Sequence, residues 1–165
     1  MMSDKSSTII VRETGEQDRE FIEKLLRDRW GSETIVTRGR VHLPVQLPGL
    51  IAEMAGEPVG LITYNIYGRE CELITMDALH EGVGIGSALL SKLAEVARGN
   101  DCRGIWLITT NDNLDAMRFY QKKGFFFVAV HRDAIKFSRK LKPEIPEIGE
   151  FGIPIRDEIE LVMPL

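Results

Sequence analysis

Three glycines, Gly82, Gly84 and Gly86, alternate with other residues between a run typical of a β-strand and a run typical of an α-helix. Glycine lets backbone N–H groups approach a ligand without obstruction by a side chain. The first N–H groups of the following helix have no partner within the helix, and the helix dipole favours an anion at this end. The loop therefore predicts a cradle for a phosphate or pyrophosphate group, although a tight turn without a ligand would have the same pattern.

Two common phosphate-binding motifs fit this loop poorly. A Walker A loop requires Gly-x-x-x-x-Gly-Lys-Ser/Thr, and Ser87 rather than a lysine follows Gly86. A dinucleotide fingerprint, Gly-x-Gly-x-x-Gly, has its third glycine one position later than this loop does. A plain nucleotide-binding domain is therefore a weaker interpretation.

The first half of the chain predicts a strand, a helix and an antiparallel meander. Residues 8–12 are rich in β-branched side chains, which favour a strand. A Thr14-x-x-Gln17 capping box begins an amphipathic helix that Gly31 ends. Residues 32–48 lack periodicity and contain prolines, so we expect a long binding loop that could include a short helix or an edge strand. Strands then follow at residues 50–54, 59–67 and 70–78.

The second half of the chain alternates helices with strands. Residues 84–97 have apolar side chains at helical spacing, and Gly99 follows them. Residues 104–109 are almost continuously apolar, which is typical of a strand buried on both faces. A strand, a helix and a strand in this order indicate a parallel pair joined by a right-handed crossover. The remaining predicted elements are a helix from Asp112 or Asn113 to Lys123 and strands at residues 125–130 and 159–163.

Composition limits the classes of protein to which the chain can belong. Its 165 residues fit one domain, which we expect at residues 8–165 after a flexible tail at residues 1–7. Its 21 basic and 25 acidic residues give a net charge of −4, which argues against nucleic acid as a partner. No apolar run approaches the ~20 residues that cross a bilayer, and no signal peptide is evident, so we expect a cytoplasmic protein without a membrane partner. Two cysteines and three histidines lack zinc-ligand spacing, so no metal is expected.

Two motifs give the chain its clearest resemblance to a known family. Residues 81–86, Glu-Gly-Val-Gly-Ile-Gly, resemble the Gln/Arg-x-x-Gly-x-Gly/Ala motif of the GNAT N-acetyltransferase family. Residues 113–125 resemble the second motif of that family, Asn-x-x-Ala-x-x-x-Tyr-x-x-x-Gly-Phe. Glu81 replaces the usual Gln or Arg, and its carboxylate would repel a pyrophosphate that it faced. The resemblance in element order covers residues 8–165, whereas the motifs lie within residues 76–125.

The resemblance implies an α/β fold with a central mixed, mostly antiparallel sheet and helices on both faces. It also implies that acetyl-CoA binds in a V-shaped gap where the strands at residues 70–78 and 104–109 diverge. The pyrophosphate would lie on the glycine loop, and the pantetheine arm would pair with the first of these strands and contact Asn113, which could also cap its helix. The implied cofactor-binding residues are Met76, Asp77, Ala78, Gly82, Val83, Gly84, Ile85, Gly86, Ser87 and Asn113.

Two catalytic residues follow from the same resemblance. Tyr120 matches the family tyrosine that protonates the departing thiolate. A phenol with a pKa near ~10 is a suitable donor to a thiolate whose own pKa is near ~8.5. The attacking amine must lose a proton, and residues 107–110 hold no acid to accept it. Glu72 is our candidate base, by likeness to family members with a glutamate on this strand, although Asp77 or an ordered water could serve instead.

The implied activity is that of an N-acetyltransferase. The acetyl group would pass from acetyl-CoA to a primary amine of a small molecule or a protein by direct attack in a ternary complex. The alternative is a non-catalytic acyl-CoA-binding module of the same fold, which the Glu81 replacement suggests. The acidic C-terminal segment would suit a cationic acceptor, whereas Arg38, Arg40 and His42 would suit an anionic group on it. Dimers are common in the family, so a homodimer is allowed by analogy.

Overall fold

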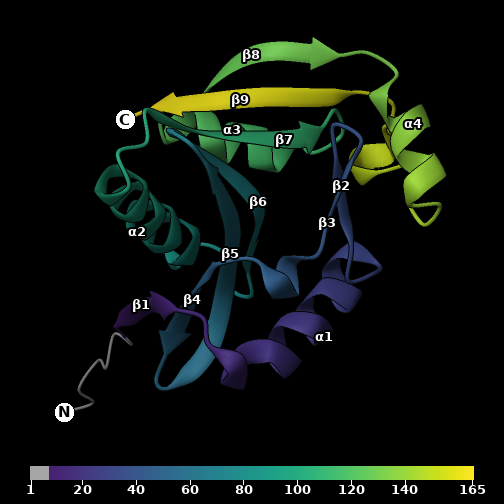
Figure 1. Ribbon diagram of the computed structural model, residues 1–165. Helices are drawn as coiled ribbons and strands as arrows, with labels where there is room; N and C mark the ends of the chain where they lie inside the picture. The colour runs from purple at the N-terminus through teal and green to yellow at the C-terminus, as the bar shows by residue number, and fades with distance from the viewer. Residues whose placement is uncertain (1–7) are drawn as a thin grey trace.

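A seven-stranded sheet in the order β1-β4-β5-β6-β7-β9-β8 organises the described part of the chain, beside a two-stranded sheet of β2 and β3 (Figure 1). The structure is a computed structural model, and it describes residues 8–165. The flexible tail predicted at residues 1–7 lies outside the described residues. The strands are β1 (Ile9–Glu13), β2 (Ile35–Thr37), β3 (Arg40–His42), β4 (Gly49–Met54), β5 (Glu57–Tyr67), β6 (Glu70–Ala78), β7 (Gly104–Thr110), β8 (Phe126–His131) and β9 (Glu158–Pro164). The helices are α1 (Arg19–Trp30), α2 (Ile85–Gly99), α3 (Leu114–Lys122) and α4 (Ala134–Leu141), with short 3₁₀ turns at Glu16–Asp18, Pro44–Gln46 and Glu150–Gly152.

Within the large sheet, β6 and β7 run parallel and the other neighbours are antiparallel. A parallel pair needs a crossover connection, and α2 supplies it between β6 and β7. The sheet is therefore mixed and mostly antiparallel, which confirms the predicted fold class. Among residues 8–165, no helix has the length and apolar character needed to cross a membrane.

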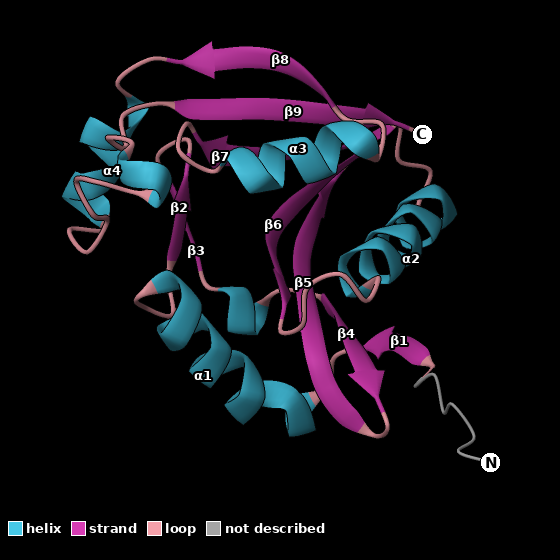
Figure 2. Cartoon of the chain, turned by 180° about the vertical axis from the view of Figure 1, so that it is seen from behind, coloured by secondary structure: helices cyan, strands magenta, loops and turns pink. Residues whose placement is uncertain are grey.

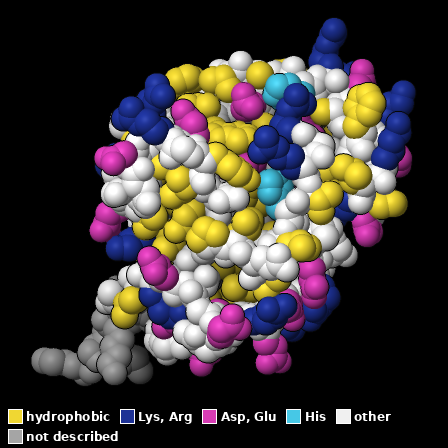
Figure 3. Space-filling model, viewed as in Figure 1, with side chains coloured by type: hydrophobic (Ala, Val, Ile, Leu, Met, Phe, Trp, Pro, Cys, Tyr) yellow, Lys and Arg dark blue, Asp and Glu magenta, His cyan; other side chains and the backbone are white. Residues whose placement is uncertain are grey.

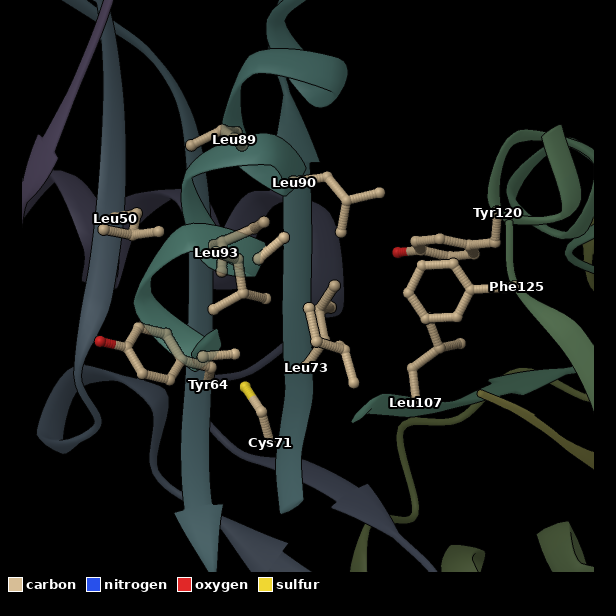
Figure 4. Close-up of a cluster of buried hydrophobic side chains, with 14 of the residues drawn as sticks. Leu50, Tyr64, Cys71, Leu73, Leu89, Leu90, Leu93, Leu107, Tyr120 and Phe125 are labelled. Atoms are coloured by element: carbon tan, nitrogen blue, oxygen red, sulfur yellow. The ribbon is translucent and has the colours of Figure 1, made fainter. Parts of the chain in front are cut away.

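Helices cover both faces of the sheet. Figures 1 and 2 show α1 and α2 on opposite sides of β4, β5 and β6. Ile62 of β5 packs with α2 and α3 on what we call the α2 face, whereas its neighbour Leu61 packs with α1 on the α1 face. Figure 4 shows leucines of α2 packed over the strands on the α2 face. Each leucine that is fully buried in this way stabilises the fold by about 1.5–3 kcal/mol relative to an exposed one.

One extra residue in β6 interrupts the alternation of its side chains. Thr75 pairs with Thr63 of β5, and Leu73 pairs with Tyr64, so Ile74 is a β-bulge between them. Leu73 packs in the core on the α2 face, and Ile74 packs in the core on the α1 face. Beyond the bulge the alternation resumes with its phase shifted by one residue.

The bulge brings two carboxylates of β6 to the same face. Before the bulge, Glu72 lies on the α1 face, where it meets Thr37 of β2. After the bulge, Met76 packs on the α2 face, and Asp77 returns to the α1 face to accept a hydrogen bond of 2.9 Å from Trp30 of α1. Positions 72 and 77 of a regular strand would face opposite sides of the sheet, because they are an odd number of residues apart.

The start of α1 differs from the prediction. The predicted Thr14–Gln17 capping box is wrong, because the carboxylate of Asp18 instead accepts the N–H of Gly15 at 2.8 Å. Arg12 of β1 donates two hydrogen bonds of 2.8 Å to Asp18 and holds the pKa of that carboxyl below its usual value. This ion pair fixes Asp18 in the first turn, and α1 begins at Arg19.

Residues 32–48 contain strands and a short helical turn, the two kinds of element that the prediction allowed within this loop. β2 and β3 form a hairpin, and a short 3₁₀ turn follows it. The hairpin lies on the α1 face, because Ile35 packs in the same core as α1. Helix α4 was not predicted from the sequence, and it lies against β2. The buried residues of this helix are Ala134, Ile135 and Ser138. Three apolar or small residues are too few to form a clear helical pattern in the sequence.

Buried polar contacts tie α4 and β9 to the β2–β3 hairpin. Lys142, just after α4, donates hydrogen bonds of 2.8 Å to the last carbonyl of α1 and to the carbonyl of Thr34. The carboxylate of Glu158 on β9 accepts a bond of 3.0 Å from Ser138 of α4 and one of 2.9 Å from the backbone N–H of Arg38 in the hairpin turn. The hairpin is therefore held at its entry and at its turn.

We expect Lys142→Met to destabilise the fold, because two buried carbonyls lose a charged donor. Such a hydrogen bond contributes about 1.5–3 kcal/mol, which corresponds to a fall in Tm of roughly 3–12 °C for a chain of this size. Scanning calorimetry measures the change. Lys136→Met, at an exposed lysine of α4, is the control and should leave Tm almost unchanged. Equal Tm values for the two variants would show that the Lys142 contacts do not stabilise the fold.

Candidate active site

β6 and β7 part after a short stretch of pairing. Glu70–Leu73 pair in parallel with Gly104–Leu107, but β6 continues to Ala78 and β7 to Thr110 without pairing to each other. Over this stretch β6 remains paired with β5, and β7 remains paired with β9. Figure 1 shows the two strands diverging. We call this unpaired stretch the β6–β7 opening, and it corresponds to the V-shaped gap that the resemblance implied.

Backbone groups of β6 face the opening. The N–H of Leu79 donates to the carbonyl of Val59 at 2.8 Å, so this pair is hydrogen-bonded. Hydrogen-bonded and non-hydrogen-bonded pairs alternate along antiparallel strands. Ala78 and Met76 therefore turn their N–H and C=O groups away from β5 and into the opening, whereas Asp77 bonds to β5. Two of the three predicted β6 residues are thus placed to pair with an extended ligand.

The glycine loop connects the end of β6 to the start of α2. Gly82 and Gly84 have φ angles of +74° and +88°, a region that glycine occupies without strain. Gly84 is the N-cap of α2 and no side chain caps this end, so the N–H groups of Ile85–Ser87 have no helical partner. The residues from Gly82 to Gly84 are exposed, as is Glu81 at the start of the loop. This arrangement fits a pyrophosphate bound through backbone N–H groups.

Asn113 lies between β7 and α3, beside the other strand of the opening. It occupies the N-cap position of α3, but its side chain makes no capping hydrogen bond. Its Nδ2 instead donates to Oγ1 of Thr109 on β7 at 3.0 Å. The side chain is therefore held at the β7 side of the opening. Asn113 occupies the N-cap position of α3, but its side chain does not cap the helix.

Tyr120 of α3 is buried on the α2 face. Its ring packs edge-to-face against Phe119 and Phe125, with ring centroids 5.4 and 5.2 Å away. In Figure 4 its hydroxyl points toward Leu90 of α2. Burial raises the pKa of Tyr120, and the negative charge of Asp77 raises it further. Tyr120 is therefore protonated at neutral pH, with a carboxylate of β6 near enough to influence it.

Glu72 is almost completely buried on the α1 face, with 1% of its surface exposed. Its Oε1 accepts a hydrogen bond of 3.2 Å from Oγ1 of Thr37 and lies 3.9 Å from Nε2 of His42. Its Oε2 is buried without a hydrogen-bond partner in the described part of the chain. Burial raises the pKa of Glu72 to about 7, and the Thr37 bond and the charge of Arg40 oppose this rise only in part. A carboxyl group that has a pKa near neutrality and one oxygen without a hydrogen-bond partner can accept and release a proton at neutral pH.

Asp77, the alternative base, lies on the same face as Glu72. Its Oδ2 accepts the hydrogen bond from Nε1 of Trp30, and burial raises its pKa. Two histidines, His80 and His131, are less suitable as bases. His80 is exposed, and His131 lies 3.8 Å from Glu160 on β9.

Charges of both signs surround the face seen in Figure 3. Hydrophobic side chains occupy the middle of this view, and acidic and basic side chains lie mainly around them. Arg38 and Arg40 are exposed, and the guanidinium of Arg40 lies 5.6 Å from the ring centre of Tyr67. His42 is buried beside Thr37, so it is not at the surface with the two arginines. The distribution of charge favours neither a cationic nor an anionic acceptor.

The family comparison matches the region that contains these features. The sequence model of the Acetyltransferase (GNAT) family matches residues 13–125, from the end of β1 to the residue before β8. The chain belongs to the GNAT family. The match confirms the resemblance that residues 81–86 and 113–125 indicated.

Two Bacillus subtilis proteins are similar to this GNAT chain over most of their length. The uncharacterized protein YdhI is 41% identical over 152 residues, which cover 92% of this chain and 95% of that protein. The uncharacterized protein YxbD is 38% identical over 148 residues, which cover 89% of this chain and 93% of that protein. Neither description names an acceptor.

Solved structures share the GNAT fold at lower identity. An IAA acetyltransferase from Bacillus cereus has a TM-score of 0.73 at 24% identity, and the match covers 96% of this chain and all of that one. A GNAT family acetyltransferase from Elizabethkingia anophelis, solved with acetyl-CoA bound, has a TM-score of 0.67 at 20% identity over 95% of this chain and 98% of that one. At these identities the similarity shows the fold.

Sequence reasoning did not find the partners of Glu72. Thr37 and His42 lie in the segment predicted as a loop, outside both family motifs. The available signal is weak. It consists of a threonine just before the Arg38-Gly39 turn and a histidine two residues after Arg40, the residue with which the threonine pairs, and many surface hairpins have similar residues.

We expect Glu72→Gln to stabilise the fold more at alkaline than at acidic pH. The pKa of about 7 exceeds the ordinary value of 4.5, so between these values the folded state binds more protons than the unfolded state. Stability therefore falls as pH rises through this window. The neutral amide removes this loss, which is at most about 3 kcal/mol. Melting curves from pH 5 to pH 8 measure it, and the exposed Glu70→Gln is the control. A Tm difference that is independent of pH would contradict the raised pKa.

Proposed function

We propose that this GNAT protein is an N-acetyltransferase that transfers the acetyl group of acetyl-CoA to a primary amine by direct attack in a ternary complex. The observation that most supports this proposal is the arrangement of two groups around the β6–β7 opening. The unpartnered Oε2 of Glu72 lies on the α1 face, and the protonated Tyr120 lies on the α2 face. A base on one side and an acid on the other suit a transfer in which the nucleophile loses a proton and the leaving group gains one.

The backbone around the opening is suited to hold acetyl-CoA. The N–H groups from Gly82 to Ser87 would bind the pyrophosphate, because those of Ile85–Ser87 have no helical partner and lie at a helix N-terminus that carries a partial positive charge. The outward-facing groups of Met76 and Ala78 would pair with the pantetheine amides, with Asn113 on the other side of the opening. One of these β6 N–H groups would also stabilise the negative charge that develops on the thioester oxygen.

Glu72 would act on the acceptor before attack. An alkyl ammonium has a pKa near ~10.4, so it is mostly protonated at neutral pH and cannot attack. Glu72 takes one proton from it and passes this proton to solvent, which a pKa of about 7 permits in both directions. The buried Oε2 is the oxygen available for this transfer, because Thr37 occupies Oε1.

Tyr120 would act on the leaving group. The neutral amine attacks the thioester carbon, a C–N bond forms, and the C–S bond breaks with its electron pair on sulfur. Tyr120 donates its proton to this thiolate, and the proton shed by the new amide nitrogen restores the phenol. The products are the acetylated amine and the CoA thiol, and one proton is released overall through Glu72.

We expect Tyr120→Phe to keep its affinity for acetyl-CoA and to lower kcat by about 10²–10⁴-fold, because only the donor to the thiolate is lost. Binding is measured by thermal unfolding with acetyl-CoA, and with NAD and ATP as controls. A ligand at ~100 times its Kd stabilises by about 2.7 kcal/mol, which is a rise in Tm of roughly 5–11 °C. Turnover is measured as release of the CoA thiol with a panel of primary amines. Tyr67→Phe is the matched control at an exposed tyrosine.

Each outcome of this experiment has a distinct meaning. Binding of acetyl-CoA without turnover of any amine by the unmodified protein would favour a non-catalytic acyl-CoA-binding module. Unchanged turnover in Tyr120→Phe would show that another group protonates the thiolate. A rise in Tm with NAD or ATP and none with acetyl-CoA would overturn the proposal.

A further inference from the structure

Two side chains of the β2–β3 hairpin approach the buried carboxylate of Glu72. Oγ1 of Thr37 lies 3.2 Å from Oε1 of Glu72 and 2.8 Å from Nε2 of His42. All three side chains are buried, with 7% of Thr37 and 6% of His42 exposed. They form an isolated polar cluster between the hairpin and β6, next to the β6–β7 opening.

The number of protons in this cluster fixes the direction of its hydrogen bonds. A threonine hydroxyl has one proton to donate, and Thr37 donates it to Glu72. Nε2 of His42 must then be the donor to Oγ1 of Thr37, which leaves the lone pair of a neutral imidazole on Nδ1. Burial lowers the pKa of His42, which favours this neutral form. Both bonds therefore point toward the carboxylate.

We propose that Thr37 and His42 are positioning residues for Glu72, and that they hold Oε1 so that Oε2 faces the acceptor amine. This inference rests on the proposed function, in which Glu72 is the base. The unpartnered Oε2 supports it, because a buried carboxylate oxygen without a donor is costly unless a ligand supplies one. The hairpin thus determines which oxygen of the base is free.

The hairpin is fixed well enough to serve this purpose. Its turn is held by the bond from the N–H of Arg38 to Glu158, and its entry by the bond from Lys142 to the carbonyl of Thr34. The charged or titratable groups that act on Glu72 are His42 and Arg40 from β3 and Glu160 from β9. Thr37 is the residue in this group that donates a hydrogen bond directly to the carboxylate.

The test compares Thr37→Val with Thr37→Ser, which keeps the hydroxyl. The pH dependence of kcat/KM for the amine should have a limb near pH 7 in the unmodified protein, set by Glu72. In Thr37→Val the carboxylate loses a hydrogen bond worth roughly one pH unit, so the limb should move up by about one unit and kcat should fall about tenfold. Thr37→Ser should restore both values. The Kd for acetyl-CoA should stay unchanged in both variants.

Glu72→Gln separates failure of this inference from failure of the proposed function. If Glu72→Gln retains the limb near pH 7, Glu72 is not the base and the proposed function is wrong in that respect. If Glu72→Gln loses the limb but Thr37→Val has an unmodified profile, the positioning role alone is wrong. His42→Gln keeps an N–H donor and His42→Phe removes it, so a shifted limb in His42→Phe only is the second expected result. The comparison of these two His42 variants also tests the inference if Thr37→Val does not fold.

Discussion

The early end of the β6–β7 pairing is the constraint on which the rest of the site depends. Each of these strands has a full antiparallel partner on its outer side, β5 or β9, so the two can separate without loss of their places in the sheet. Their separation leaves backbone donors and acceptors unpaired in the interior of a sheet, where such groups are normally satisfied. An extended ligand with amide groups is a natural partner for them. The glycine loop and α3 then lie at the two sides of the same opening.

The buried charges of the protein divide into two kinds. Asp18 is held by Arg12 and has a lowered pKa, as expected of a carboxylate that stabilises the fold. Glu72 and Asp77 are buried without a cation in hydrogen-bond contact, and burial raises the pKa of each. Their ionised forms reduce the stability of the folded state, so their position beside the opening is better explained by chemistry than by stability.

The sequence was informative where the signal lies in consecutive residues. The glycine loop, the motif of α3 and the order of most strands could be predicted in this way, and the family match agrees with them. The partners of Glu72 could not, because Thr37 is 35 positions away and no local pattern links the two. Helix α4 and the hairpin depend on contacts of still longer range, such as that between Arg38 and Glu158, 120 positions apart. The capping-box prediction was wrong for a related reason. Arg12 holds Asp18 in the first turn, where Asp18 rather than Gln17 accepts a backbone N–H.

The bulge at Ile74 has a consequence for how the chemistry of this strand is encoded. If the same sequence formed a regular strand without the bulge, every residue after Ile74 would change sides, so Met76 would lie on the α1 face and Asp77 on the α2 face. The polarity of the two walls would be exchanged without a single substitution. The bulge in β6, as much as its composition, therefore determines which wall is acidic and which is apolar.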